Sequence, residues 1–209
     1  MFGTHDLTLF ILSGLLLNIT PGADSLYIAT RGITQGVRAS VAAALGIGTG
    51  CLVHIFAAAL GLSAILAASS MAFTVIKLVG AAYLVYVGIG MLRTTTATTA
   101  TQPALAQAPL GKVFAQGFLT NVLNPKVALF FLAFVPQFID PAATHKPLAF
   151  LFLGAIFNIN GTLWCLFIAW ISARFRSFGV NRRAGRWLNR TVGGIFVLLG
   201  LRLALAEPA

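Results

Sequence analysis

The stretch that decides the fold reads LLLNITPGAD over residues 15–24, and it places a Pro-Gly pair and the acid Asp24 inside a hydrophobic run. A second break, NVLNPK at residues 121–126, interrupts a later hydrophobic run. Both runs are long enough to span a bilayer. Lipid offers no hydrogen-bond partner for a carbonyl that a proline frees, nor for an unpaired charge. The two breaks therefore predict a functional site.

The composition is that of a polytopic membrane protein. Of the 209 residues, 58% are hydrophobic and 9% are charged, whereas soluble domains carry about 25% charged residues. The net charge of +10 does not indicate nucleic-acid binding, because the basic residues lie almost entirely between hydrophobic runs, where they set topology. The N-terminus has no basic n-region and no A-x-A site, so we expect no cleaved signal peptide. We predict a single transmembrane domain in contact with membrane lipids.

Six hydrophobic segments of helical length are predicted to be membrane spans. Their approximate bounds are 7–29, 39–65, 70–92, 113–138, 147–172 and 190–206. The odd-numbered connections carry ten basic residues, Arg31 and Arg38 among them, and the even side carries two. The positive-inside rule then puts the odd connections in the cytoplasm and both termini outside. Five spans with the N-terminus inside stay open as an alternative, if one segment is re-entrant.

The chain divides into two halves that resemble each other. A linker rich in Thr, Ala, Gln and Pro, at about 93–112, separates repeat 1 (about 7–92) from repeat 2 (about 113–206). Each half has a proline break in its first span, and KLVGAAYL at 77–84 is similar to RTVGGIFV at 190–197. Three spans per half give the halves opposite orientation, which is the inverted-repeat plan of many secondary transporters. Chance similarity between apolar stretches is the alternative.

Each break predicts two half-helices that meet near the middle of a span. The prolines free the carbonyls four residues earlier, those of Leu17 and Asn121. The residues before the prolines, Thr20 and Asn124, are good N-caps, and proline is favoured at the first helical position. A helix start exposes N–H groups and a partial positive charge. Two such starts would form a cradle for a carboxylate.

Asp24 and Lys126 give the predicted site both signs of charge. Asp24 follows the first break, where the helix dipole favours an acid, whereas Lys126 follows the second, where a cation needs a nearby anion. That anion would be Asp24 or a substrate carboxylate. A ligand with both charges, such as an α-amino acid, fits with its ammonium on Asp24. Asp24 is also the candidate for proton coupling, because one carboxylate that can protonate is enough. Two simple kinks, or an Asp24 that faces the cytoplasmic interface, are the alternatives.

The predicted substrate site draws on both breaks. Its residues are Asn18, Thr20, Pro21, Gly22, Asp24, Asn121, Asn124, Pro125 and Lys126. His54, Asn158 and Asn160 are candidates for lining a cavity, since polar side chains in spans face the interior. For His54 we expect a packed, hydrogen-bonded ring, with a proton relay as the alternative. The Gly-x-Gly-x-Gly run at 46–50 predicts close helix packing. We expect no metal, no cofactor and no enzymatic activity.

Several stretches carry a resemblance to a known family. They are PGAD at 21–24, RG at 31–32, QGVR at 35–38, ALGIGTG at 44–50, GAAYL at 80–84 and GFLTNVLNPKVALFF at 117–131. Together they resemble the LysE/RhtB family of bacterial amino-acid exporters, nearest to its homoserine/threonine branch. The resemblance implies a plasma-membrane exporter of neutral amino acids or related metabolites, driven by the proton motive force. The family commonly has a second proline where this chain has Ala23, which predicts a softer first break.

Two other functions stay open from the sequence. Cys51 and Cys165 lie in the second span of each half, and a membrane thiol–disulfide carrier passes reducing equivalents through such a pair. Neither cysteine has a basic neighbour that would favour the thiolate, and small core residues are the simpler expectation. A passive solute channel is the other alternative. The sequence identifies neither the solute nor the stoichiometry, and it leaves homo-oligomerisation open.

Overall fold

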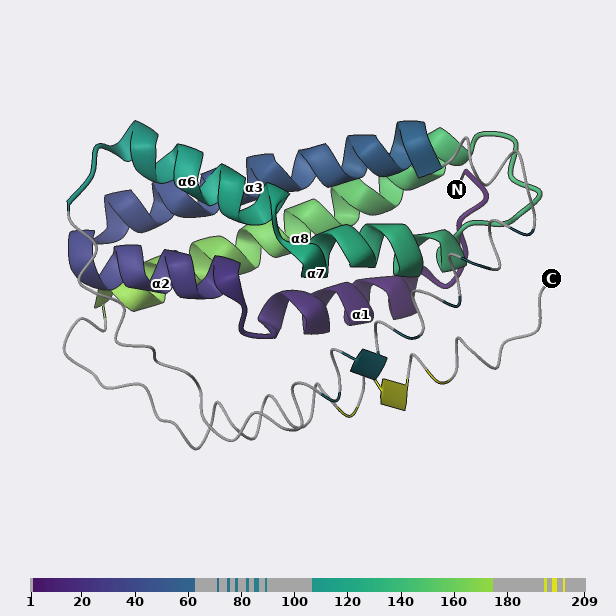
Figure 1. Cartoon of the computed structure of the whole chain (residues 1–209), viewed down its shortest axis with the longest axis horizontal. Coiled ribbons are helices and arrows are strands. Elements are labelled where there is room, and N and C mark those ends of the chain that lie inside the picture. Colours follow the sequence, from purple (N-terminus) through teal and green to yellow (C-terminus); the bar gives the residue numbers. More distant parts are fainter. Residues whose placement is uncertain are drawn as a thin grey trace.

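The computed structural model describes residues 2–62 and 107–174, together with scattered positions between 71 and 89 and between 194 and 201. The described ranges form a bundle of long helices that lie side by side (Figure 1). Their only β contact is an isolated bridge at the end of the bundle. The all-α class is therefore confirmed for this part of the chain.

Part of the predicted architecture lies outside the described residues. This holds for the third span at 70–92, the sixth span at 190–206, most of the linker and the arginine-rich fifth connection. The total of six spans and the inverted relation of the halves therefore stay predictions. A helix begins at Leu110, close to the predicted end of the linker at about residue 112.

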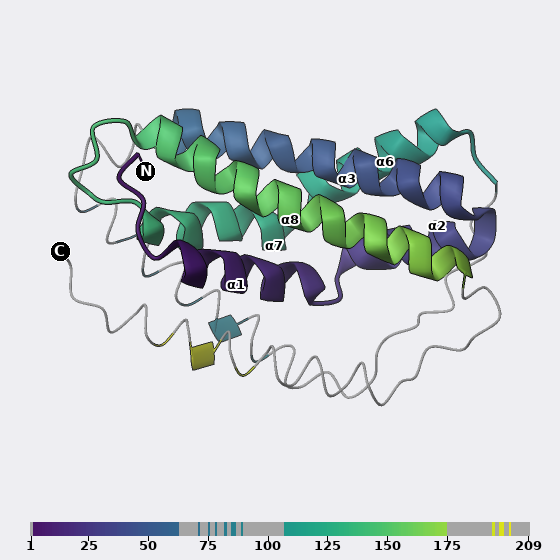
Figure 2. The same ribbon diagram turned by 180° about the vertical axis from the view of Figure 1, so that it is seen from behind.

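Two continuous helices are long and apolar enough to cross a membrane. Helix α3 (Val37–Ala57) continues through the π-helical turn η1 (Ala58–Leu62) as one stretch of 26 residues. Helix α8 (Lys146–Arg174) has 29 residues. These helices match the predicted second and fifth spans and pack along each other, as Figure 2 shows from behind.

Two further spans are broken where the sequence predicts it. Helices α1 (Leu7–Ile19) and α2 (Ala23–Gln35) meet at a bend of 51°. Helix α6 (Leu110–Val122) meets the next helical segment at a bend of 44°. That segment consists of α7 (Pro125–Leu129), the π-helix η2 (Phe130–Phe134) and the 3-10 helix η3 (Val135–Phe138). Each bent pair has the length and composition of one membrane span, so the described residues provide up to four spans.

Helices α3 and α6 approach closely because glycines lie at their contact. A side chain at Gly46 would overlap the backbone oxygen of Phe114, and a Cβ on Gly50 would lie 2.6 Å from the oxygen of Phe118. Gly117 on α6 meets the α3 backbone in the same way, with an added Cβ only 2.5 Å from an oxygen. The packing interpretation of the glycine run is therefore confirmed.

Two hydrophobic cores fill the described bundle. One is aromatic, and its ring centroids lie 4.4–6.0 Å apart around Phe130; its rings include Phe10, Phe130, Phe131, Phe134 and Phe157. The other consists mainly of small side chains; its members are Ile28, Ala43, Ala44, Ile47, Val113, Cys165 and Ala169. Residues of both cores line the cavity described below, so the polar site lies between them.

The first connection is shorter than predicted. Only Gly36, with a φ of +88°, separates α2 from α3. Arg31, which the sequence interpretation placed in a cytoplasmic connection, lies inside α2 and is 2% exposed. Its guanidinium lies 5.5 Å from the centre of the Tyr27 ring and donates to Gln116 Oε1 on α6 at 2.8 Å. The prediction that Arg31 lies in a connection was wrong. The end of α2 is polar like a loop, but it is helical and packs against α6.

Candidate functional site

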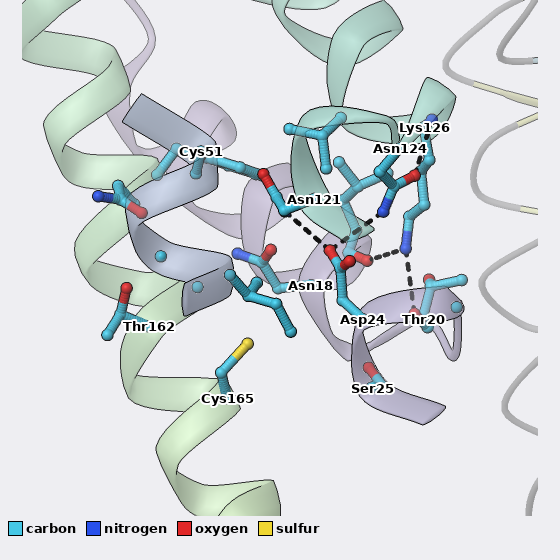
Figure 3. Close-up of a pocket in the computed structure, with 18 residues that line it drawn as sticks. Asn18, Thr20, Asp24, Ser25, Cys51, Asn121, Asn124, Lys126, Thr162 and Cys165 are labelled. Carbon is cyan, nitrogen blue, oxygen red and sulfur yellow. Dashed lines mark hydrogen bonds between the residues drawn. The ribbon is translucent and has the colours of Figure 1, made fainter. Parts of the chain in front are cut away.

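The two breaks lie against each other and enclose one cavity, shown in Figure 3. Its volume is about 50 Å³. Helices α1 and α2 contribute one wall, α6 and α7 a second, and α3 and α8 the rest. The 18 lining residues are Leu17, Asn18, Thr20, Gly22, Asp24, Ser25, Ile47, Gly48, Cys51, Asn121, Asn124, Lys126, Val127, Phe157, Asn158, Gly161, Thr162 and Cys165.

Asp24 joins the two breaks through its carboxylate. It lies in the first turn of α2, and its Oδ2 accepts hydrogen bonds from Asn121 Nδ2 at 2.9 Å and Asn124 Nδ2 at 3.0 Å. Its other oxygen, Oδ1, is buried and has no hydrogen-bond partner. The carboxylate is thus oriented by one oxygen and keeps the other for a further donor.

Lys126 holds the end of α1. Its Nζ donates to the backbone oxygens of Leu17 at 2.6 Å and Thr20 at 3.0 Å. The Leu17 carbonyl is the group that the first proline frees, and a cation suits the C-terminal end of a helix dipole. We expected an anion beside Lys126, but it forms no ion pair with Asp24 within the described residues. The carbonyl oxygens take that place.

The second break has the predicted local cap. Asn124 Oδ1 accepts the backbone N–H of Lys126 at 3.0 Å, and Pro125 occupies the first turn of α7. The Asn121 carbonyl that Pro125 frees accepts the Asn124 N–H at 2.9 Å and His54 Nε2–H at 2.9 Å. The backbone groups at this break are therefore satisfied by its own residues together with His54 of α3, as a helix end inside a membrane requires.

Thr20 does not cap the first break as predicted. It is the C-cap of α1, and its hydroxyl donates back to Leu16 O at 2.7 Å. Helix α2 has Gly22 as its N-cap instead, in an extended conformation and without a side-chain hydrogen bond. The prediction was wrong because the break takes up Pro21 and Gly22 before the next helix begins.

Three buried polar atoms at the cavity have no hydrogen-bond partner. They are the amide nitrogen of Asn18, Oδ1 of Asp24 and Oδ1 of Asn121. All three residues line the cavity. An unpartnered buried polar atom costs roughly 1–3 kcal/mol. One donor and two acceptors with unmet hydrogen bonds around the same space are the properties of a binding site.

Most of the residues predicted from the sequence line this cavity. They are Asn18, Thr20, Gly22, Asp24, Asn121, Asn124, Lys126 and Asn158. Pro21 and Pro125 shape the breaks without lining the cavity, and Asn160 does not line it. His54 faces a second, apolar cavity of about 340 Å³ at the junction of α3 and α7, where its ring stacks on Phe131 with a centroid distance of 6.4 Å. The packed histidine is therefore confirmed.

Of the wall built by α3 and α8, the sequence interpretation identified only Asn158. The residues of this wall that it missed are Ile47, Gly48, Cys51, Phe157, Gly161, Thr162 and Cys165. Both cysteines are buried, as expected of core residues, and they also face the cavity. A signal existed for α8, because Thr162 and Cys165 follow Asn158 at helical spacing and so lie on the same face.

Comparison with known proteins agrees with this structure. Residues 15–207 match the family model described as LysE type translocator. An uncharacterized membrane protein of Pseudomonas aeruginosa is 32% identical, over 98% of this chain and 97% of its own. A homoserine/homoserine lactone efflux protein of Salmonella typhimurium is 30% identical over 96% of both chains. A leucine efflux protein of Salmonella choleraesuis is 24% identical, over 99% of this chain and 98% of its own. No solved structure matches the chain.

The family match covers nearly the whole chain, and these relatives align over nearly their full lengths. The resemblance stated from the sequence is therefore confirmed. The apolar helices, two of them continuous and four forming bent pairs, are those of a multi-pass membrane protein. The chain belongs to the LysE family of translocators, which are transporters and not enzymes.

Proposed function

We propose that the protein is a secondary active exporter of neutral amino acids of the threonine or homoserine kind in the bacterial plasma membrane, coupled to the proton motive force. The observation that carries the proposal is the set of unpartnered polar atoms around one cavity, beside a carboxylate and an ammonium group. Relatives named as homoserine/homoserine lactone and leucine efflux proteins support the substrate class.

The ammonium group of the substrate binds at Asp24. Oδ1 of Asp24 and Oδ1 of Asn121 are buried acceptors without donors, and an ammonium group supplies three donors. Asn121 and Asn124 hold the other carboxylate oxygen at 2.9 and 3.0 Å, so the acceptor is oriented before the substrate arrives. A charge-assisted hydrogen bond in such a site is about twice as strong as a neutral one.

The carboxylate group of the substrate binds between Lys126 and Asn18. Two protons of the Lys126 ammonium point to the carbonyls of Leu17 and Thr20, which leaves the third for a carboxylate oxygen. The Asn18 amide offers a second, unpartnered donor. These two donors come from different breaks, so a bound carboxylate links them.

Proton coupling follows from competition at one group. Among the acidic residues that the structure describes, Asp24 alone lines the cavity. A single carboxylate binds either a proton or the substrate ammonium, and the alternation between them exchanges one for the other across the membrane. The cavity of about 50 Å³ is smaller than the roughly 300 Å³ of ordinary ligand pockets. Its walls must therefore separate to admit an amino acid.

The test is export from proteoliposomes that contain the purified protein and are screened over a panel of amino acids with an imposed pH gradient. We expect movement of threonine or homoserine against its concentration gradient, abolished by a protonophore. Asp24→Asn should reduce proton-driven flux by about 100-fold, the effect of losing a charged hydrogen bond worth roughly 3 kcal/mol. The matched control is Asp6→Asn, at an acid whose side chain is 69% exposed and does not line the cavity.

Two outcomes would contradict the proposal. Unchanged flux through Asp24→Asn would remove the coupling residue, and flux that never exceeds the concentration gradient would indicate a passive channel. The thiol–disulfide alternative has one observation in its favour, since Cys51 and Cys165 line the same cavity. Full transport by the double variant Cys51→Ala, Cys165→Ala dismisses it.

A further inference from the structure

Threonine hydroxyls in the described helices follow one rule with one exception. Beyond the first helical turn, the hydroxyl donates to the carbonyl four residues earlier at 2.7–2.8 Å in Thr20, Thr30, Thr34, Thr49 and Thr120. This local bond is the usual way for a threonine to satisfy its hydroxyl in a helix. The hydroxyl of Thr162 on α8 has no hydrogen bond within the described part of the chain.

The free hydroxyl of Thr162 belongs to the cavity wall. Thr162 lines the cavity together with Cys165 on the same helix (Figure 3). A Cβ on Gly48 of α3 would lie 2.6 Å from Thr162 Oγ1, so the hydroxyl occupies the space that the glycine leaves open. Among the other residues of this wall, Asn158 is polar, the rest are small or apolar, and none is charged.

We propose that Thr162 determines specificity by binding the side-chain hydroxyl of the transported amino acid, with Gly48 as the residue that positions it. This inference rests on the proposed function. Asp24 and Lys126 take the two charged groups of the substrate, which leaves the α3–α8 wall for its side chain. A hydroxyl both donates and accepts, so Thr162 pairs with a substrate hydroxyl in either sense. The preferred substrate is then a short hydroxylated amino acid, and its isosteric aliphatic analogue is rejected.

The test compares threonine with valine, which differ by a hydroxyl against a methyl group. Competitive export is measured in proteoliposomes for the wild type and for Thr162→Val, a variant of nearly equal shape. We expect Thr162→Val to lower the threonine-to-valine ratio by about tenfold, the effect of one hydrogen bond. Thr162→Ser keeps the hydroxyl and should keep the preference. Thr49→Val removes an exposed hydroxyl bonded to Leu45 O, and should leave the ratio unchanged.

The outcomes separate this inference from the function on which it rests. A wild type that exports no amino acid contradicts both. A wild type that exports amino acids without preferring threonine over valine overturns the inference alone. An equal loss for both substrates in Thr162→Val would assign the hydroxyl to the amino-acid group, and this also overturns it. If Thr162→Val fails to fold, Gly48→Ala provides the second variant, because its methyl group displaces the Thr162 hydroxyl and should lower the ratio as well.

Discussion

The two helix breaks differ in how their backbone groups are satisfied. The second break, between α6 and α7, has its own cap, since Asn124 accepts the N–H of Lys126 and donates its own N–H to the Asn121 carbonyl. The first break, between α1 and α2, has no side-chain cap at the start of α2. The carbonyls at its α1 end depend on the Lys126 ammonium, which comes from the other break.

The second break therefore keeps its cap without a residue of the first, whereas the first break depends on a side chain of the second. A break that caps itself keeps its geometry when the neighbouring helices move, whereas a break held by one distant side chain is released when that side chain leaves. In the proposed function the substrate carboxylate takes the third proton of the same ammonium that donates to the two α1 carbonyls. Substrate binding therefore acts on the side chain that holds the end of α1.

The largest effect is expected when Lys126 is replaced by methionine. Lys126→Met leaves two carbonyls at the end of α1 without this donor but keeps the backbone N–H that Asn124 accepts. We expect export to fall by about 100-fold and the free energy of unfolding to fall by about 2 kcal/mol. The loss of two hydrogen bonds is partly offset, because the variant no longer buries a charge. Hydrogen exchange should increase at residues 17–22 and change little at 121–127.

The matched control for this prediction is Lys112→Met, because Lys112 is exposed at the start of α6. It removes the same charge and should change neither export nor hydrogen exchange. Equal deprotection of both breaks in Lys126→Met would contradict the dependence of the first break on the second. It would show that the two breaks are stabilised as one unit.

A smaller effect separates the caps of the two breaks. Asn124→Ala removes an N-cap and one donor to Asp24, so we expect a loss of about 2 kcal/mol in the free energy of unfolding. Thr20→Val removes a hydroxyl whose acceptor, Leu16 O, keeps the backbone N–H of residue 20 at 3.1 Å. Its cost should stay below about 1 kcal/mol. Thermal unfolding in detergent measures both, and equal melting temperatures would refute the asymmetry.

The same asymmetry explains what the sequence could predict. The cap at Asn124 is local, so the Asn-Pro pair was enough to place it. The partners of Lys126 lie 109 and 106 residues away in the sequence. The position of Lys126 at a helix start predicts a nearby anion, but in the folded chain backbone carbonyls from α1 take its place. The sequence did not predict Thr162 as a site residue, because threonines are common in apolar helices. Only the space above Gly48 and the missing local hydrogen bond distinguish it.

The smallest effect is expected at His54, which supports the second break from outside. Its Nε2 bonds to the Asn121 carbonyl at 2.9 Å, but that carbonyl also accepts the N–H of Asn124. His54→Phe keeps the stacking on Phe131 and should cost only about 0.5 kcal/mol, because the Asn121 carbonyl keeps its other donor. Since Asp24 is the proposed proton acceptor, the pH dependence of export by His54→Phe should match that of the wild type. A loss of the pH dependence of export in His54→Phe would identify His54 as a proton relay. The second break would then depend on His54 for export, although its backbone hydrogen bonds do not.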